Sequence, residues 1–274
     1  MTRHLKSALC EAIRLGAAKP VPAARRSTDE LVDIDFSSLV TYFECGYRYW
    51  LRHVCGFQPP LATELGFGKL LHHLVAELAR KAAAGEPPPE ADVDAILDRS
   101  FYLPFAGPIP AAKLREAARR RGRAYVRRFG EELMRVIQPE ARFEVPLANA
   151  RVRGRIDLLL RAPNGDSNAV ELIDFKTSSN RPPSEVHQNQ LRMYAVAVER
   201  LGFKPVSLVI QDLDADAGGR HIVLNDHSQR EEFTRRLEGW VDEIRGGRFD
   251  AAEDRKTCAA CDFRCFCARE WRTA

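Results

Sequence analysis

The sequence predicts an α/β fold, in which a compact sheet with its covering helices lies inside a mostly helical surround. Two observations predict it. Apolar residues recur at helical spacing through most of the first 140 residues. From residue 141 onward the apolar pattern changes to that of strands, and three strands are followed by a helix and then by further strands.

The N-terminal half is predicted to be helical. Residues 1–33 are expected to form a helical arm and a linker, because prolines and paired arginines occupy its second half. Asp35 to Val54 is predicted as one helix, and Gly66 to Ala84 as a second that ends before Gly85 and a run of three prolines. Residues 85–140 are then expected to form a helical insertion.

The C-terminal half carries the predicted sheet. Asn149-Ala150 and residues 163–166 supply turns between successive strands. In chain order the expected strands and helices are Arg142–Ala148, Arg151–Arg161, Ala169–Phe175, the helix Glu185–Leu201, Pro205–Asp212, Arg220–Leu224 and the amphipathic helix Glu231–Ile244.

The composition is that of a globular protein. The 274 residues carry 42 Lys and Arg against 38 Asp and Glu, a net charge of +4, and 45% of them are hydrophobic. No apolar run reaches the roughly 18 residues of a transmembrane helix, and the first ten residues lack the apolar segment of a secretory signal. A cytoplasmic location without membrane contact is therefore expected, where the seven cysteines should not form disulfides.

Acidic residues occupy neighbouring positions on two predicted strands. Asp157 ends the run Gly154-Arg155-Ile156-Asp157, and Asp174 begins Asp174-Phe175-Lys176-Thr177 at the end of the next strand. On adjacent strands of one hairpin the two carboxylates can converge, and their repulsion favours a bound cation. Oxygen ligands suit a hard divalent ion such as Mg²⁺ or Mn²⁺. Lys176 falls on the same face as Asp174, where a cation can orient a water and stabilise charge on a phosphoryl group. A partly exposed ion-pair cluster is the alternative.

These motifs resemble those of the PD-(D/E)XK nuclease superfamily, in particular its RecB-like branch. That branch has an upstream helical His, a Gly-x-x-Asp strand, an Asp-x-Lys motif and a helix bearing Gln-x-x-x-Tyr. The same order is found here in Gly68-Lys69-Leu70-Leu71-His72, the two acidic runs, and Gln190-Leu191-Arg192-Met193-Tyr194. The resemblance implies a restriction-endonuclease-like core sheet flanked by helices, within a nuclease domain at 34–257.

The resemblance also implies roles for individual residues. The divalent metal would be bound by His72, Asp157, Asp174 and the backbone carbonyl of Phe175. Lys176 would position the attacking water, while Gln190 and Tyr194 would hold DNA near the metal. The alternatives are that His72 is an ordinary histidine on a helix face and that Tyr194 packs in the core.

Four of the seven cysteines lie between Cys258 and Cys267. Such crowding in a reducing compartment favours a metal, either zinc held by four tail cysteines or an iron–sulfur cluster held by three of them and one from elsewhere. The second arrangement resembles the iron–sulfur nucleases of the RecB-like branch, of the AddB and CRISPR-adaptation types. It implies a structural 4Fe-4S cluster and a cap in which the tail 258–274 packs on the helix of the early cysteine. The implied ligands are Cys45, Cys258, Cys261 and Cys267, with Cys265 as a competitor for the last position.

Basic residues gather on one predicted helix. Lys113 to Arg128 contains eight basic residues and one acid, Glu116, which indicates either a solvated face or a surface for the DNA backbone. The candidate DNA contacts are Arg119, Arg120, Arg123, Arg127, and on a strand Arg153 and Arg155.

The sequence therefore predicts a metal-dependent DNA nuclease, with exonuclease activity on single-stranded DNA ends as the first expectation, in DNA repair, recombination or phage defence. The lack of a Gly-Lys-Thr or Gly-Lys-Ser phosphate loop indicates that no motor is encoded here. The runs around Cys45 and 244–249 resemble the C-terminal nuclease domain of UvrD-like helicases, so a separate helicase is a possible partner. The alternatives are a nuclease that trims pre-spacers in CRISPR adaptation and a non-catalytic DNA-binding iron–sulfur scaffold.

Overall fold

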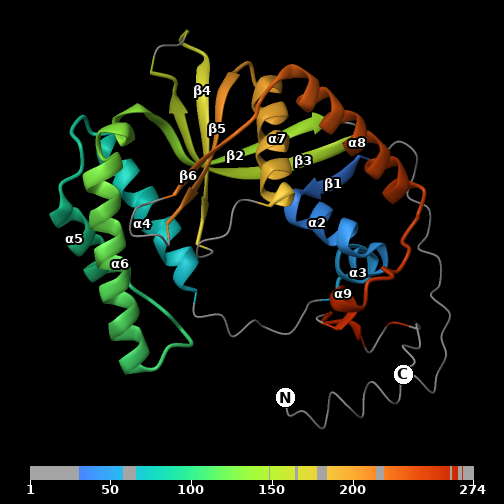
Figure 1. Ribbon diagram of the computed structural model, residues 1–274, viewed down its shortest axis with the longest axis horizontal. Helices are drawn as coiled ribbons and strands as arrows, with labels where there is room; N and C mark the ends of the chain where they lie inside the picture. The colour runs from blue at the N-terminus through green and yellow to red at the C-terminus, as the bar shows by residue number, and fades with distance from the viewer. Residues whose placement is uncertain are drawn as a thin grey trace. The chain divides into compact units, whose positions relative to one another are not determined.

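The structure is a computed structural model that describes residues 31–57, 66–147, 149–163, 166–177, 184–213, 219–259, 261–264 and 267. These residues form two compact units (Figure 1). The larger unit contains the described residues between 63 and 237, and the smaller unit those up to 62 and from 238 onward. The predicted arm at 1–33 lies almost wholly outside the described residues. The predicted bounds of arm, nuclease domain and tail therefore stay predictions.

The larger unit is built on a mixed sheet. Strands β2 (Val136–Leu147) and β3 (Ala150–Arg161) form a long antiparallel hairpin, and β3 continues antiparallel to β4 (Ala169–Lys176). Strand β4 pairs in parallel with β5 (Lys204–Asp212), which pairs antiparallel with β6 (Arg220–Val223). The parallel pair requires a crossover, and helix α7 (Glu185–Arg200) supplies it, lying along the sheet in Figure 1.

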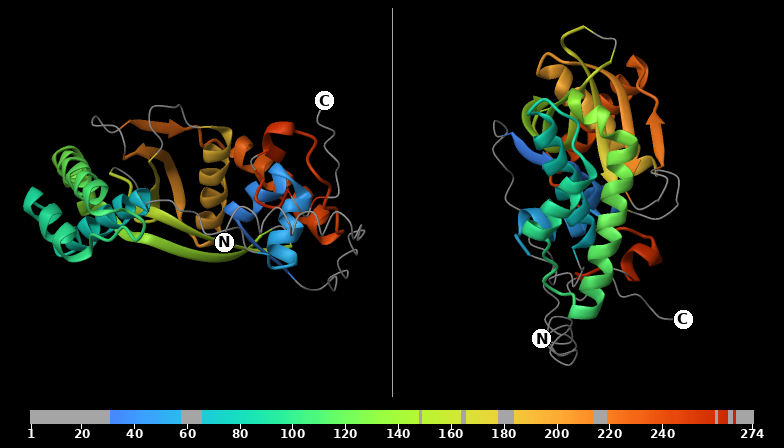
Figure 2. Two further views of the ribbon diagram at one scale, coloured as in Figure 1. Left: turned by 90° about the horizontal axis from the view of Figure 1, so that it is seen from below. Right: turned by 90° about the vertical axis from the view of Figure 1, so that its left-hand side faces the viewer.

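Helices α4 (Phe67–Ala82), α5 (Glu90–Ser100) and α6 (Pro108–Phe129) form a group beside the sheet, seen in all views of Figures 1 and 2. Leucines of α4 and Val93, Ile96 and Leu97 of α5 are buried in one cluster with Phe175 of β4. Burial at this spacing explains the helical periodicity of the region, because each helix presents one apolar stripe to a shared core. The same core packs α4 against the sheet.

The smaller unit contains β1 (Val32–Asp35), α2 (Phe36–Glu44), the single turn α3 (Gly46–Tyr49), the π-helical turn η1 (Trp50–Val54) and α9 (Arg255–Ala259). Asp35 begins α2 with a capping box, in which its side chain accepts from Ser38 N and Ser38 Oγ accepts from Asp35 N. Helix α8 (His227–Arg245) starts in the larger unit and ends in the smaller one.

The prediction of one continuous helix from Asp35 to Val54 is wrong at Cys45. This residue is extended, with φ −170° and ψ 112°, so it ends α2 and caps α3. The reason is close packing with the segment around Asp250. A Cβ on Gly46 would lie 2.9 Å from Asp250 N, and Tyr47 N donates to Asp250 O at 3.2 Å. Apolar spacing alone does not reveal such a break.

The predicted α/β class, with a core sheet flanked by helices, is confirmed. The expected helical insertion at 85–140 contains α5, α6 and the short 3₁₀ turn η2 (Glu131–Arg135), but β2 begins at Val136, so its last residues are strand. Among the described residues, no helix is long and apolar enough to span a bilayer.

Candidate active site

Asp157 and Asp174 lie where the β3–β4 ladder ends. The last paired residues are Leu158 and Ile173, so the two aspartates are the next residues on each strand. Beyond this point a side chain joins the two strands in place of a backbone carbonyl: Asp157 Oδ2 accepts a hydrogen bond from Phe175 N at 2.7 Å. The hairpin geometry expected from the sequence therefore brings both carboxylates to one end of the strand pair.

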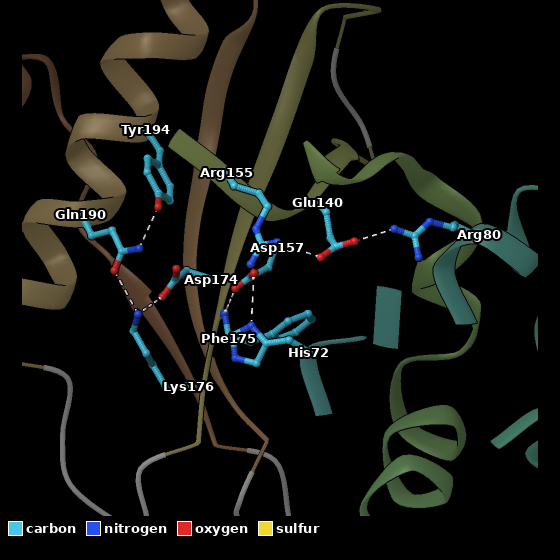
Figure 3. Close-up of polar contacts among 10 residues, drawn as sticks. All are labelled: His72, Arg80, Glu140, Arg155, Asp157, Asp174, Phe175, Lys176, Gln190 and Tyr194. Carbon is cyan, nitrogen blue, oxygen red and sulfur yellow. Dashed lines mark hydrogen bonds and ion pairs between the residues drawn. The ribbon is translucent and has the colours of Figure 1, made fainter. Parts of the chain in front are cut away.

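His72 of α4 faces the same carboxylate. Its Nδ1 lies 3.2 Å from Asp157 Oδ1, and its ring stands edge-on to the Phe175 ring with centroids 5.6 Å apart (Figure 3). Gly68 lets the first turn of α4 approach the end of β4, since a Cβ there would lie 2.7 Å from Thr177 Oγ1. The glycine and histidine of the upstream helix thus both belong to the site.

Asp174 is a buried acid paired with one lysine. Its side chain is 4% exposed, and its Oδ2 forms an ion pair with Lys176 Nζ at 2.6 Å. Burial raises the pKa of Asp174 to about 6, with the Lys176 charge opposing the shift and the Asp157 charge adding to it. A carboxylate in this state gains most from an added cation.

Lys176 is held in place from α7. Its Nζ donates to Gln190 Oε1 at 2.9 Å, and Gln190 Nε2 donates to Tyr194 Oη at 2.8 Å (Figure 3). Residues 190 and 194 are one helical turn apart, so the amide and the phenol line one face of α7. The structure thus joins Gln190 and Tyr194 to the lysine, whereas the sequence predicted that they contact DNA.

A residue that the sequence analysis missed completes this chain of contacts. Phe143 of β2 pairs with Gly154 of β3, and its ring packs edge-on against Tyr194 with centroids 5.5 Å apart. A Cβ on Gly154 would lie 2.3 Å from Phe143 Cζ and 3.0 Å from Tyr194 Cε1. The glycine of the Gly-x-x-Asp motif therefore makes room for two rings. Only the β2–β3 register reveals the part played by Phe143.

The donor set suits a divalent metal ion. Two carboxylates and a strand carbonyl are oxygen ligands that suit Mg²⁺ and Mn²⁺, and His72 adds one imidazole nitrogen beside them. Within the described residues, however, no three His, Cys, Asp or Glu side chains converge on a ready-made metal position. Asp157 is instead engaged by His72 and Phe175, and Asp174 by Lys176.

The predicted DNA-contacting arginines mostly form ion pairs. Arg119 and Arg123 of α6 contact Asp94 of α5, and the α6 stripe also pairs Arg127 with Glu90. On β3, Arg153 contacts Glu144 and Arg155 contacts Glu140. Arg120 also has interactions within the chain. Helix packing between α5 and α6 thus neutralises part of the basic stripe, and a DNA contact at these residues stays a prediction.

The four cysteines named as cluster ligands line one cavity in the smaller unit. Cys45, Cys258, Cys261 and Cys267 surround about 350 Å³ of space, part of it open to solvent, together with apolar residues such as Leu51 and Phe263. Cys45 Sγ accepts from the backbone N–H groups of Arg48 at 3.4 Å and Ala252 at 3.3 Å. Burial raises the pKa of the Cys261 thiol, so a thiolate there needs a nearby cation. Cys265 lies outside the described residues.

A family model for the PD-(D/E)XK nuclease superfamily matches residues 35–268, which include every side chain of the site. No curated protein matches the chain. Nucleases of this superfamily typically use divalent metal ions.

The chain also matches two solved structures at low identity. The crystal structure of SSO0001 has 12% identity, a TM-score of 0.38, and 96% of each chain covered. The "Putative exonuclease" from Eubacterium rectale has 12% identity and a TM-score of 0.49, with 100% of this chain and 94% of that chain covered. Both TM-scores are below 0.5, so the family match alone carries the assignment.

Proposed function

Because the chain belongs to the PD-(D/E)XK nuclease superfamily, we propose that it is a divalent-metal-dependent deoxyribonuclease that hydrolyses phosphodiester bonds. The observation that carries the proposal is the buried pair Asp157 and Asp174 where the β3–β4 ladder ends, with Lys176 Nζ at 2.6 Å from Asp174 Oδ2. A buried pair of carboxylates with only one lysine is costly unless a further cation compensates their charge. A non-catalytic scaffold would not need to retain all three side chains.

The proposed metal ligands are His72, Asp157, Asp174 and the carbonyl of Phe175. Mg²⁺ or Mn²⁺ bound there would lower the pKa of a water and neutralise charge on the phosphate. Lys176 lies beside this position with its ammonium fixed by Gln190, so it can hold the attacking water and stabilise the charge that develops on the phosphoryl oxygens. His72 and the Phe175 N–H orient Asp157 through both of its oxygens.

The nuclease proposal is tested with 5′-labelled oligonucleotides, single-stranded and duplex, in Mg²⁺, in Mn²⁺ and in EDTA. Wild-type protein should cleave with either metal, while Asp174→Asn should reduce the rate at least about 100-fold. Asp166→Asn is the matched control, because it changes an exposed acid at the other end of the same hairpin and should leave the rate unchanged. Equal cleavage by the Asp174 variant and wild type would exclude this site.

We propose further that the substrate is a single-stranded DNA end. The ladder of products separates an exonuclease, which releases nucleotides stepwise from one end, from an endonuclease, which cuts internally. Activity confined to short 3′ overhangs of duplexes would favour the alternative of pre-spacer trimming. Work beside a separate helicase, in repair, recombination or phage defence, is proposed on the resemblance alone and is tested by co-purification.

In the smaller unit we propose a structural 4Fe-4S cluster bound by Cys45, Cys258, Cys261 and Cys267. The proposal is supported by the cavity that all four cysteines line and by two N–H groups directed at Cys45 Sγ. Hydrolysis needs no redox step, so the cluster would join segments distant in sequence. Protein purified without oxygen should contain four iron and four sulfide per chain and absorb near 400 nm. Stoichiometric zinc without iron would favour the zinc alternative.

A further inference from the structure

A row of alternating charges begins beside Asp157. Arg155 of β3 donates to Glu140 Oε1 at 3.1 Å, and Arg80 of α4 donates to Glu140 Oε2 at 2.5 Å (Figure 3). Arg80 also pairs with Glu77, whose other oxygen accepts from Arg99 of α5 at 3.0 Å. The row therefore contains three arginines and two glutamates, and it links the strand of Asp157 to the group of helices beside the sheet.

The backbone at Glu140 is strained to make this arrangement. Its φ of 50° lies in the left-handed region, which is unfavourable for a residue other than glycine. Its neighbours Pro139 and Ala141 pair with Leu158 and Ile156, so Glu140 stands across from Asp157. A residue other than glycine keeps this backbone conformation only where its surroundings hold it. The direction of the Glu140 side chain, opposite Asp157, is therefore fixed.

The row presents positive charge to solvent. The side chains of Arg155, Arg80 and Arg99 are 51%, 43% and 60% exposed, whereas those of Glu140 and Glu77 are 28% and 24% exposed. Each guanidinium has five N–H donors and spends only one or two on these carboxylates. The less exposed glutamates therefore orient the guanidinium groups, and the remaining N–H donors of the arginines stay available to a ligand. Three arginines and two glutamates give the row a net charge of 3 − 2 = +1.

From this geometry we propose that Arg155, Arg80 and Arg99 form a phosphate-binding row for the DNA strand that enters or leaves the active site over α4 and α5. The proposal rests on the proposed function and adds the path of the substrate. Planar, pre-oriented guanidiniums bind phosphate oxygens in pairs. Exposed ion pairs contribute little to stability, so phosphates can bind these donors without unfolding the site.

The test measures binding rather than cleavage. A labelled single-stranded oligonucleotide is titrated with protein in EDTA at several salt concentrations, and fluorescence anisotropy gives the dissociation constant. Each phosphate contact to single-stranded DNA contributes about 0.7 to the slope of log K against log salt. Arg80→Gln and Arg99→Gln should each make the slope shallower by about 0.7. Arg80→Lys should keep the wild-type slope, because the positive charge is kept.

Arg236→Gln on α8 is the matched control, because its side chain is 44% exposed and also pairs with a glutamate, Glu185. It should leave the slope unchanged, and melting temperatures show whether each variant is folded. Wild-type slopes for folded Arg80→Gln and Arg99→Gln, or an equal loss for Arg236→Gln, would overturn the row. Failure of the proposed function is distinguishable, because it appears as wild-type protein that binds DNA in EDTA but cleaves none in Mg²⁺ or Mn²⁺.

Discussion

Replacing Gly154 by Ala should damage the site without touching any charged group. The new Cβ would lie 2.3 Å from Phe143 Cζ and 2.5 Å from Cε1, whereas carbon atoms in contact prefer about 3.5 Å or more. The two groups must separate by roughly 1.2 Å. Both rings are buried, with Phe143 8% and Tyr194 5% exposed, so neither can swing into solvent. Overpacking of this kind costs about 1–3 kcal/mol.

The displacement of Tyr194 should also lower the catalytic rate. Moving its ring breaks the hydrogen bond from Gln190, and Gln190 then holds Lys176 less firmly. Thermal unfolding should show a melting temperature lowered by roughly 4–8 °C for about 2 kcal/mol, and the Mg²⁺-dependent cleavage rate should fall at constant KM.

Adding Phe143→Leu provides the internal control. Leucine lacks the ring atoms that the new Cβ would contact. The double variant should therefore lose about 1–2 kcal/mol less free energy of unfolding than the two single variants lose together. A Gly154→Ala protein with wild-type stability and activity would refute the placement of the two rings over Gly154.

Three further predictions follow from the same contacts. Tyr194→Phe removes the hydroxyl that fixes the Gln190 amide and should lower kcat about tenfold with little change in KM, whereas a direct DNA contact would raise KM instead. In EDTA, Asp174→Asn should stabilise the protein at pH 7 by about 2–3 kcal/mol but not below about pH 4, because burial raises the pKa of Asp174 from 3.8 to about 6. Stability from this acid is complete below its unfolded pKa and is lost as pH rises through 6. Urea unfolding at both pH values checks this, and a variant less stable at pH 7 would contradict it. Cys45→Ser should abolish absorption near 400 nm and lower the melting temperature, whereas the exposed Cys55→Ser should change neither; an unchanged spectrum in Cys45→Ser would remove it from the ligand set.

The order of strands and helices was predictable because buried faces repeat in the sequence. Strands β3 and β4 alternate or run continuously apolar, and the helix α7 that follows them carries one buried stripe. The meeting of Asp157 and Asp174 was also predictable, since a short hairpin leaves few registers in which both strands bury their apolar residues.

Other features depend on contacts between segments far apart in sequence. The extended Cys45 is set by the approach of residues 250–252, some 205 positions later. The pairing of Arg119 and Arg123 with Asp94 depends on how α5 and α6 rotate against each other. The left-handed backbone of Glu140 gives no sequence signal, since glutamate does not favour that region.

The most direct test of the central claim is the cleavage rate of single-stranded DNA by wild-type protein and by Lys176→Gln, each stripped of metal and then supplied with Mg²⁺ or Mn²⁺. The account predicts no cleavage before metal is added, cleavage by wild type afterwards, and a rate at least about 100-fold lower for Lys176→Gln, whose fold is verified by its melting curve. Cleavage that persists in EDTA, or a Lys176→Gln protein as fast as wild type, would contradict it.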